Sequence, residues 1–185
     1  TVDNDLAVTD CCPGFGSVAK YVVTSTIEAA LDVESMYETS TKVFILEVMG
    51  RHAGWIAGSS CLAQDSHPGA PHIILLPEIS FNQKKFLAKV KETVKKNGFC
   101  VIVASEGIKN SQGKFLAESD SKDAFGHSQL GGVAPRLADL INQKLKLKNH
   151  WAVADYLQRS ASHLSSGVDR AHAYEVGRKA VLYAT

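Results

Sequence analysis

Three short, mostly apolar runs recur along the chain, and they constrain its fold more than any other feature. They span residues 42–48, 72–76 and 99–104. Each run is rich in Val, Ile and Leu and lacks polar/apolar alternation, which is typical of strands buried on both faces. Helical patterns separate the runs. The sequence therefore predicts an α/β fold, with a mainly parallel sheet flanked by helices in a Rossmann-like three-layer sandwich.

The segments between the runs have the spacing of amphipathic helices. Phe86, Val90 and Val94 follow one another at intervals of four, and Asn97-Gly98 is typical of a helix end. Residues 107–132 are rich in Gly, Ser, Asp and Gln and show no strong periodicity, so we expect a long loop there, either functional or a plain surface excursion. Further helices are predicted over about 16–33, from Gly54 to about 61, over 137–145 and over 168–184, and a fourth strand over 151–157.

Length and composition favour a globular protein of about one domain. The 185 residues carry Lys+Arg 20 and Asp+Glu 19, a net charge of +1, so nothing in the balance favours nucleic acid or an anionic membrane as partner. No apolar run approaches the roughly 18 residues of a membrane span. The four cysteines show neither a disulfide framework nor a zinc spacing, which favours reduced thiols and a cytoplasmic location.

Charged residues follow the predicted strands closely. Arg51, Glu78, Glu106 and Arg159 each lie just past the end of a strand. In parallel sheets, ligands bind outside the carboxyl ends of the strands. These four side chains are therefore predicted to share one rim of the sheet.

Two further strings contain the parts of a phosphoryl-transfer site. Residues 1–6 offer two carboxylates, Asp3 and Asp5, and the string from Met49 places Arg51 at a turn bracketed by glycines. A carboxylate base, a carboxylate that faces a metal ion and a fixed arginine suit phosphoryl transfer, because that reaction depends on positioning and charge neutralisation. The D-N-D triplet by itself is more typical of a solvated turn.

Taken together, these strings resemble the phosphofructokinase family. The resemblance rests on Thr-Val-Asp-Asn-Asp at 1–5, Met-Gly-Arg at 49–51, Pro-Glu at 77–78, Tyr-Leu-Gln-Arg at 156–159 and Val-Asp-Arg-Ala at 168–171, in the family's order. The amino-acid sequences of residues 49–57, 125–132 and 156–161 are most similar to those of the pyrophosphate-dependent 6-phosphofructokinase branch.

The resemblance implies roles for the reacting groups. Asp3 is implied to be the general base that takes the proton from the C1 hydroxyl of fructose 6-phosphate, and Arg51 to stabilise the transferring phosphoryl group. Thr1 is implied to contact substrate. Asp5 is implied to help organise Mg²⁺, or, alternatively, to bond the local backbone.

The resemblance also implies a set of sugar-phosphate contacts. Met49 and Gly50 belong to the sugar-phosphate loop, and Glu78 is similar to the family's contact with the sugar hydroxyls. Tyr156 and Arg159 look like the pair that holds the 6-phosphate. Lys42 occupies the position from which a basic residue reaches a neighbouring subunit's site, which implies a homo-oligomer, although a lysine at the start of a strand is also common.

The chain departs from the family at several places. His150 stands where relatives usually have an arginine, so that phosphate contact is in doubt or depends on pH. The Gly-Gly-Asp loop that cradles the phosphoryl donor in relatives lies upstream of their Thr1 position. We therefore expect a segment truncated at both ends and inactive alone. Residues 1–15 would be a catalytic-base loop of the donor-side domain, 16–157 the sugar-phosphate domain with its long loop, and 158–185 a hinge and a helix returning toward the donor side.

Two other functions stay open. Tyr156 and Ser160-Ala161 favour pyrophosphate as donor, and ATP is the alternative. A non-catalytic sugar-phosphate-binding module would keep the fold and lose the chemistry. The presence of Asp3, Asp5 and Arg51 favours the enzyme, because a binding module has no need of a base.

Overall fold

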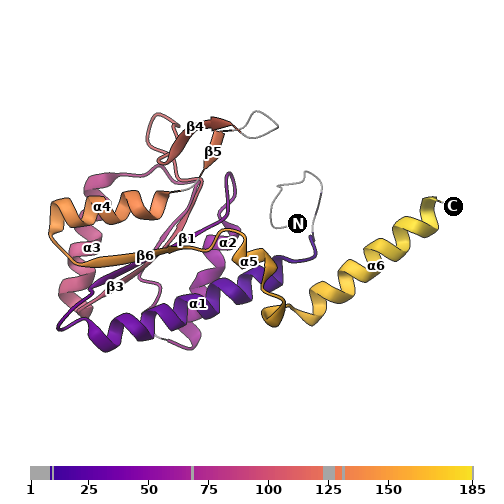
Figure 1. Cartoon of the computed structure of the whole chain (residues 1–185), viewed down its shortest axis with the longest axis horizontal. Helices are drawn as coiled ribbons and strands as arrows, with labels where there is room; N and C mark the ends of the chain where they lie inside the picture. The colour runs from indigo at the N-terminus through magenta and orange to yellow at the C-terminus, as the bar shows by residue number, and fades with distance from the viewer. Residues whose placement is uncertain (1–8, 10, 68, 123–127, 131, 185) are drawn as a thin grey trace.

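The fold is built on a four-stranded sheet whose paired strands all run parallel. The computed structural model describes residues 9, 11–67, 69–122, 128–130 and 132–184. The sheet contains β1 (Val43–Val48), β2 (Ile73–Leu75), β3 (Cys100–Ser105) and β6 (Asn149–Val153), in the order β2-β3-β1-β6. Figure 1 shows the sheet between two layers of helices. The predicted α/β fold class is confirmed.

The two central strands, β1 and β3, are almost entirely buried, which explains their uninterrupted apolar sequences. Every residue of β3 is buried, and five of the six residues of β1 are. Parallel pairing sets Val48 opposite Ser105, and Glu47 opposite both Ala104 and Val153. Because the strands are parallel, all their carboxyl ends meet at one edge of the sheet.

Helices cover both faces of the sheet. On one face α1 (Phe15–Met36) and α2 (Trp55–Ser59), followed by the 3₁₀ helix η1 (Ser60–Asp65), pack against Leu46 and Val48. On the other face α3 (Gln83–Asn97) and α4 (Val133–Leu145) pack against Ile45 and Ile102. Side chains of a strand alternate between the two faces, so each buried strand contributes to both cores.

Two sequence predictions need correction. The fourth strand begins at Asn149 rather than at Trp151 and ends at Val153, because the chain turns at Asp155, whose φ of 40° breaks an extended strand. The segment 107–132 is not a plain loop: it contains β4 (Glu118–Lys122) and β5 (Ser128–Leu130), which pair antiparallel. These strands are too short to show a period in the sequence.

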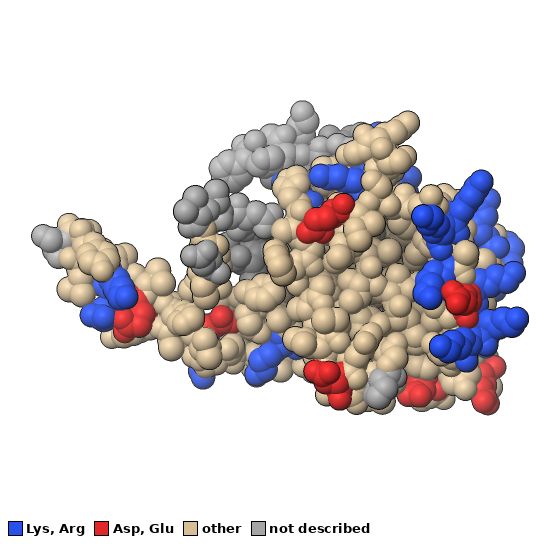
Figure 2. All heavy atoms as spheres, turned by 180° about the vertical axis from the view of Figure 1, so that it is seen from behind, with Lys and Arg blue, Asp and Glu red and all other residues tan. Residues whose placement is uncertain are grey.

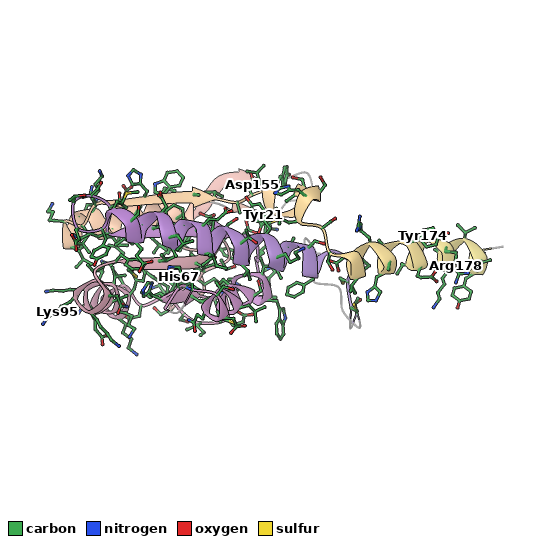
Figure 3. All side chains as sticks on the ribbon, turned by 90° about the horizontal axis from the view of Figure 1, so that it is seen from below. Tyr21, His67, Lys95, Asp155, Tyr174 and Arg178 are labelled. Carbon is green, nitrogen blue, oxygen red and sulfur yellow. The ribbon has the colours of Figure 1, made fainter. Side chains whose placement is uncertain are left out.

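The remaining helices follow the sheet. After β6 come α5 (Leu157–Ser160), the 3₁₀ helix η2 (Ser162–Leu164) and α6 (Gly167–Ala184). Figure 1 shows α6 projecting away from the rest of the fold, and Figure 3 places Tyr174 and Arg178 on this projecting part. None of the described residues of α6 is buried.

One carboxylate joins α6 to α1. The Asp169 carboxylate accepts hydrogen bonds from the Ser17 backbone N–H and from the Ser17 hydroxyl, both at 2.6 Å. Partial burial acts to raise the pKa of Asp169, but hydrogen bonds from Ser17 and from the backbone outweigh it and lower the pKa. Because Gly14 at the start of α1 has no side chain for capping, Asp169 supplies the acceptor that the first turn of α1 needs.

Basic side chains gather at one end of the molecule. Figure 2 shows most of the Lys and Arg residues at the end opposite α6. Helix α3 contributes an exposed set there: Lys84, Lys85, Lys89, Lys91, Lys95 and Lys96. Within the described part of the chain, no helix has both the length and the apolar character needed to cross a membrane.

A half-buried histidine, His72, is expected to make stability depend on pH. The His72 Nδ1 accepts a hydrogen bond from the Val101 N–H at 3.0 Å, and burial, together with the nearby His67, lowers the pKa of His72 from 6.5 to about 4. The unfolded chain therefore binds more protons between about pH 6.5 and pH 4, so stability falls as the pH falls through this window. A pKa shift of this size would change the free energy of unfolding by about 3 kcal/mol in a fully buried group. The partial exposure of His72 reduces this change to about 1–2 kcal/mol.

His72→Asn tests this dependence, because its side-chain oxygen can still accept from Val101 but does not titrate. Urea unfolding at pH 7 and pH 4.5 should show a smaller loss of stability on acidification in His72→Asn than in wild type. The exposed His163, changed to Asn, is the control and should follow wild type. The nearby His67, labelled in Figure 3, is the same in all three proteins. Its Nε2 lies 3.2 Å from the Glu34 carboxylate of α1 in the wild-type structure. Equal losses in wild type and His72→Asn would contradict the prediction.

Candidate active site

The carboxyl ends of β1, β3 and β6 surround a small hollow of about 100 Å³. In parallel sheets, ligands bind at this position, outside the carboxyl ends of the strands. Its walls combine two apolar valines with carboxylate, amide and thioether groups. The residues that line it are Glu47, Val48, Met49, Glu106, Val153, Asp155 and Gln158.

A buried amide joins the two loops that form this hollow. Gln158 is only 2% exposed, although its neighbours in α5 are on the surface. Its Oε1 accepts from the Met49 N–H at 3.2 Å, and its Nε2 donates to the Asp155 carbonyl at 2.8 Å. Gln158 therefore holds the loop after β6 against the end of β1.

Glu106 lies in the wall of the hollow and also supports the loop after β1. Its Oε1 accepts from the Gly50 N–H at 3.3 Å, and its own N–H donates to the Val48 carbonyl at 3.0 Å. The carboxylate thus stands next to Met49 at the rim.

Glu47 is the one charged residue among the buried polar residues of the described chain, at 1% exposure. Its two carboxylate oxygens accept from the Gly132 N–H at 3.1 Å and from the Ala134 N–H at 2.7 Å. Burial raises the pKa of Glu47; the hydrogen bonds from Ala134 and Gly132 oppose the shift, and the nearby Glu106 adds to it. The central strand therefore supplies the acceptor for the first turn of α4, whose own cap residue is a glycine.

The predicted cations lie on the loops around the hollow. Arg51 follows Gly50 in the loop after β1 and is half-buried. Arg159 lies in α5, where its guanidinium stacks on the Tyr156 ring, 4.2 Å from the ring centre. Tyr156 is 62% exposed, so its phenol faces solvent at this rim. The structure brings Met49, Gly50, Arg51, Tyr156 and Arg159 to one edge of the sheet.

Two predicted residues lie outside the hollow, Glu78 at the same edge of the sheet and Lys42 at the opposite edge. The Glu78 carboxylate accepts from the Gly54 N–H at 2.7 Å, where it steadies the start of α2, and it is not among the residues that line the hollow. The Lys42 ammonium donates to the Tyr37 carbonyl at 2.6 Å at the amino end of β1, the opposite edge of the sheet. Their predicted contacts with substrate stay predictions.

Three predicted residues, Thr1, Asp3 and Asp5, lie outside the described residues. The described part of the chain contains no group of three or more His, Cys, Asp or Glu side chains that could hold a metal ion. The described residues therefore do not by themselves provide a ligand set for the Mg²⁺ that the family resemblance implies.

Sequence reasoning missed the polar residues that organise the hollow. The sequence predicts Glu106 on the rim without a role, and it predicts no role for Gln158 or Glu47. A signal was present for Glu47, a carboxylate inside an otherwise apolar run. Gln158 belongs to the Tyr-Leu-Gln-Arg string, but no local pattern predicts that its side chain is buried, because its burial follows from how α5 folds back on β1.

The fold and the hollow define an α/β domain with a candidate ligand site at the carboxyl ends of its strands. The chain belongs to the phosphofructokinase family, whose model, described as Phosphofructokinase, matches residues 1–184.

Two proteins that are highly similar to this chain share one name. It is 61% identical over 181 residues to the pyrophosphate--fructose 6-phosphate 1-phosphotransferase of Halomonas elongata, covering 98% of this chain and 43% of that protein. It is 59% identical to the protein of that name from Xanthomonas campestris, covering 100% of this chain and 44% of the relative.

A solved structure agrees. The pyrophosphate-dependent phosphofructokinase of Marinobacter aquaeolei superposes with a TM-score of 0.83 at 56% identity, covering 100% of this chain and 42% of that one. The chain therefore spans less than half the length of these relatives.

The buried carboxylate of Glu47 should be costly to remove. Glu47→Ala leaves the N–H groups of Gly132 and Ala134 at the start of α4 without their acceptor, so we expect a loss of about 2–4 kcal/mol in the free energy of unfolding. Glu47→Gln keeps one accepting oxygen and should lose less. Glu92→Ala on the exposed face of α3 is the matched control, with an expected change within about 0.5 kcal/mol. Urea unfolding at pH 7 measures all three, and equal losses for the two alanine variants would refute the role of Glu47.

Proposed function

We propose that this chain is the acceptor-side segment of a 6-phosphofructokinase. The enzyme transfers a phosphoryl group to the C1 hydroxyl of fructose 6-phosphate and gives fructose 1,6-bisphosphate. The observation that carries the proposal is the hollow at the strand ends, with Glu106 and Gln158 in its walls and Arg51 and Arg159 on the adjoining loops. A sugar phosphate needs both hydroxyl acceptors and a cation for its phosphate, and this edge of the sheet offers both.

The sugar-phosphate contacts follow from these positions. Arg159 and Tyr156 would hold the 6-phosphate, since a guanidinium fork and a phenol suit a phosphate dianion. Met49 and Gly50 would line the sugar. Glu106, in the wall of the hollow, would accept hydrogen bonds from sugar hydroxyls, whereas Glu78, bound to Gly54, would have to act from outside that wall.

The reacting groups would come from two segments. Asp3 would take the proton from the C1 hydroxyl as that oxygen attacks the donor phosphorus, and Arg51 would neutralise charge on the transferring group. Thr1 would contact substrate beside them. That Asp5 helps to organise Mg²⁺ stays a prediction, since the described residues provide no set of metal ligands.

We propose pyrophosphate as the donor and place the donor site outside this chain. The support is the name of the relatives that are 59–61% identical to it, together with Tyr156 and Ser160-Ala161. Residues 1–15 would belong to the donor-side domain, 16–157 would bind the sugar phosphate, and 158–185 would return toward the donor side. The projecting α6, with none of its described residues buried, suits that last assignment.

We also propose a homo-oligomer. Seven extended residues at about 3.3 Å each separate Lys42 from Met49 by about 23 Å, so Lys42 is too far from the hollow of its own chain. Lys42 could serve the site of a second copy. The edge strand β6 leaves Trp151 47% exposed and Val153 37% exposed, which suits contact with another subunit.

The four free cysteines agree with a cytoplasmic location.

The donor assignment can be measured directly. The full-length enzyme that contains this segment, supplied with Mg²⁺ and fructose 6-phosphate, should turn over with pyrophosphate and poorly with ATP in a coupled assay. The 185-residue chain alone should show no turnover with either donor, because positioning of the donor carries most of this chemistry. A preference for ATP would overturn the donor assignment. Full-length enzyme inactive with both donors would favour the non-catalytic binding module.

The phosphate contact can be measured on the same full-length enzyme. Arg159→Ala should raise the Kd for fructose 6-phosphate about 10–100-fold in calorimetric titration, because a charge-assisted pair with phosphate is worth about 1.5–3 kcal/mol. Arg178→Ala on the projecting α6, where Arg178 pairs with Glu175 at 2.8 Å, is the matched control and should leave the Kd unchanged. Equal affinities of Arg159→Ala and wild type would show that Arg159 does not hold the phosphate.

A further inference from the structure

The N–H and the carbonyl of Gly50 both form hydrogen bonds with consecutive residues at the end of β3, namely Ser105, Glu106 and Gly107. The Gly50 carbonyl accepts hydrogen bonds from the Ser105 hydroxyl and from the Gly107 N–H, the latter at 3.2 Å. The Gly50 N–H donates to the Glu106 carboxylate. This carbonyl belongs to the peptide bond that leads into Arg51, so the groups that fix it also fix where the arginine begins.

The two loops touch through their backbones. At Gly107, a Cβ would lie 2.0 Å from the Arg51 carbonyl oxygen, and at Gly50, where φ is +140°, it would lie 2.8 Å from the Ser105 hydroxyl. Neither position has room for a side chain. The close approach brings the Ser105 hydroxyl and the Gly107 N–H to the same carbonyl, and both hydrogen bonds hold the peptide before Arg51 in its observed orientation.

The hydroxyl of Ser105 is not needed to fill the core. Ser105 ends a strand whose other members, Cys100 to Ala104, are apolar and fully buried, and Ser105 itself is 0% exposed. An alanine would fit the same space. The Gly50 carbonyl would still accept from the Gly107 N–H, so loss of the hydroxyl should cost the fold little stability. What the hydroxyl adds is a second donor that restricts the Gly50–Arg51 peptide.

We propose that Ser105 is a positioning residue for phosphoryl transfer: its hydroxyl fixes the Gly50–Arg51 peptide and so holds the Arg51 guanidinium where the transferring phosphoryl group develops charge. The proposal rests on the function proposed above for Arg51. Groups that stabilise a transition state must be fixed before the reaction, and small displacements are costly. The sugar side of the site is held by a different bond, from Gln158 to Met49, and should not be affected.

The kinetic test uses the full-length enzyme and two alanine variants. Ser105→Ala should lower kcat about 10–100-fold and leave KM for fructose 6-phosphate within about twofold, because Arg51 acts in the transition state. Ser60→Ala is a matched control: Ser60 is also 0% exposed, and its hydroxyl donates to the Ala57 carbonyl at 2.5 Å, between α2 and η1. The two variants should lose similar stability on thermal unfolding, and only Ser105→Ala should lose kcat. Equal kcat in both variants, or a loss in Ser105→Ala that appears only in KM, would overturn the proposal.

A second measurement does not depend on activity. Amide hydrogen exchange in the same proteins should be faster at Gly50 and Gly107 in Ser105→Ala than in wild type, and unchanged there in Ser60→Ala. Unchanged exchange at both glycines would overturn the claim that Ser105 fixes this peptide. Wild-type enzyme without turnover on either donor would instead overturn the proposed function, and with it the catalytic part of the proposal, while the exchange result would still decide the structural part.

Discussion

The parallel pairing of β1 with β3 on one side and with β6 on the other is the interaction on which the rest of the structure depends. Its register sets Val48 opposite Ser105 and Glu47 opposite Val153, so three strands end at almost the same height. The loops that follow are therefore neighbours from the outset. The central strands can be buried on both sides because helices cover both faces of the sheet (Figure 1).

Polar groups then turn this shared edge into an organised site. The amide of Gln158 binds the loop after β6 to Met49, and the carboxylate of Glu106 binds the loop after β3 to Gly50. Glu47, on the central strand, holds the start of α4. Each of these side chains bonds to backbone from another segment of the chain, so the geometry of the rim depends on tertiary contacts. Unpaired polar groups in such places would be costly, which gives the arrangement little freedom.

Much of the fold was accessible from the sequence because its strands and helices differ in period. The run 99–104 predicts a strand whose ends lie within one residue of those of β3. The spacing of Phe86, Val90 and Val94 predicts the helix α3. The prediction was weaker where the local pattern is short. Residues 107–132 contain two strands of five and three residues, which are too short to be predicted from their pattern. The predicted fourth strand extends past the end of β6, since the turn at Asp155 has no strong sequence signal.

The sequence by itself determined the family and the class of fold, because both depend on residue types in a fixed order along the chain. It also placed Arg51 and Arg159 just past strand ends, which parallel pairing then brings to one edge. Only the tertiary structure decided which polar side chains face the hollow. Glu78 and Glu106 both follow strands, yet the first bonds to Gly54 and the second lines the hollow beside Met49. That choice depends on how the loops after β1 and β3 pack together, where Gly50 and Gly107 leave no room for side chains, and such a contact between distant segments has no local sequence pattern.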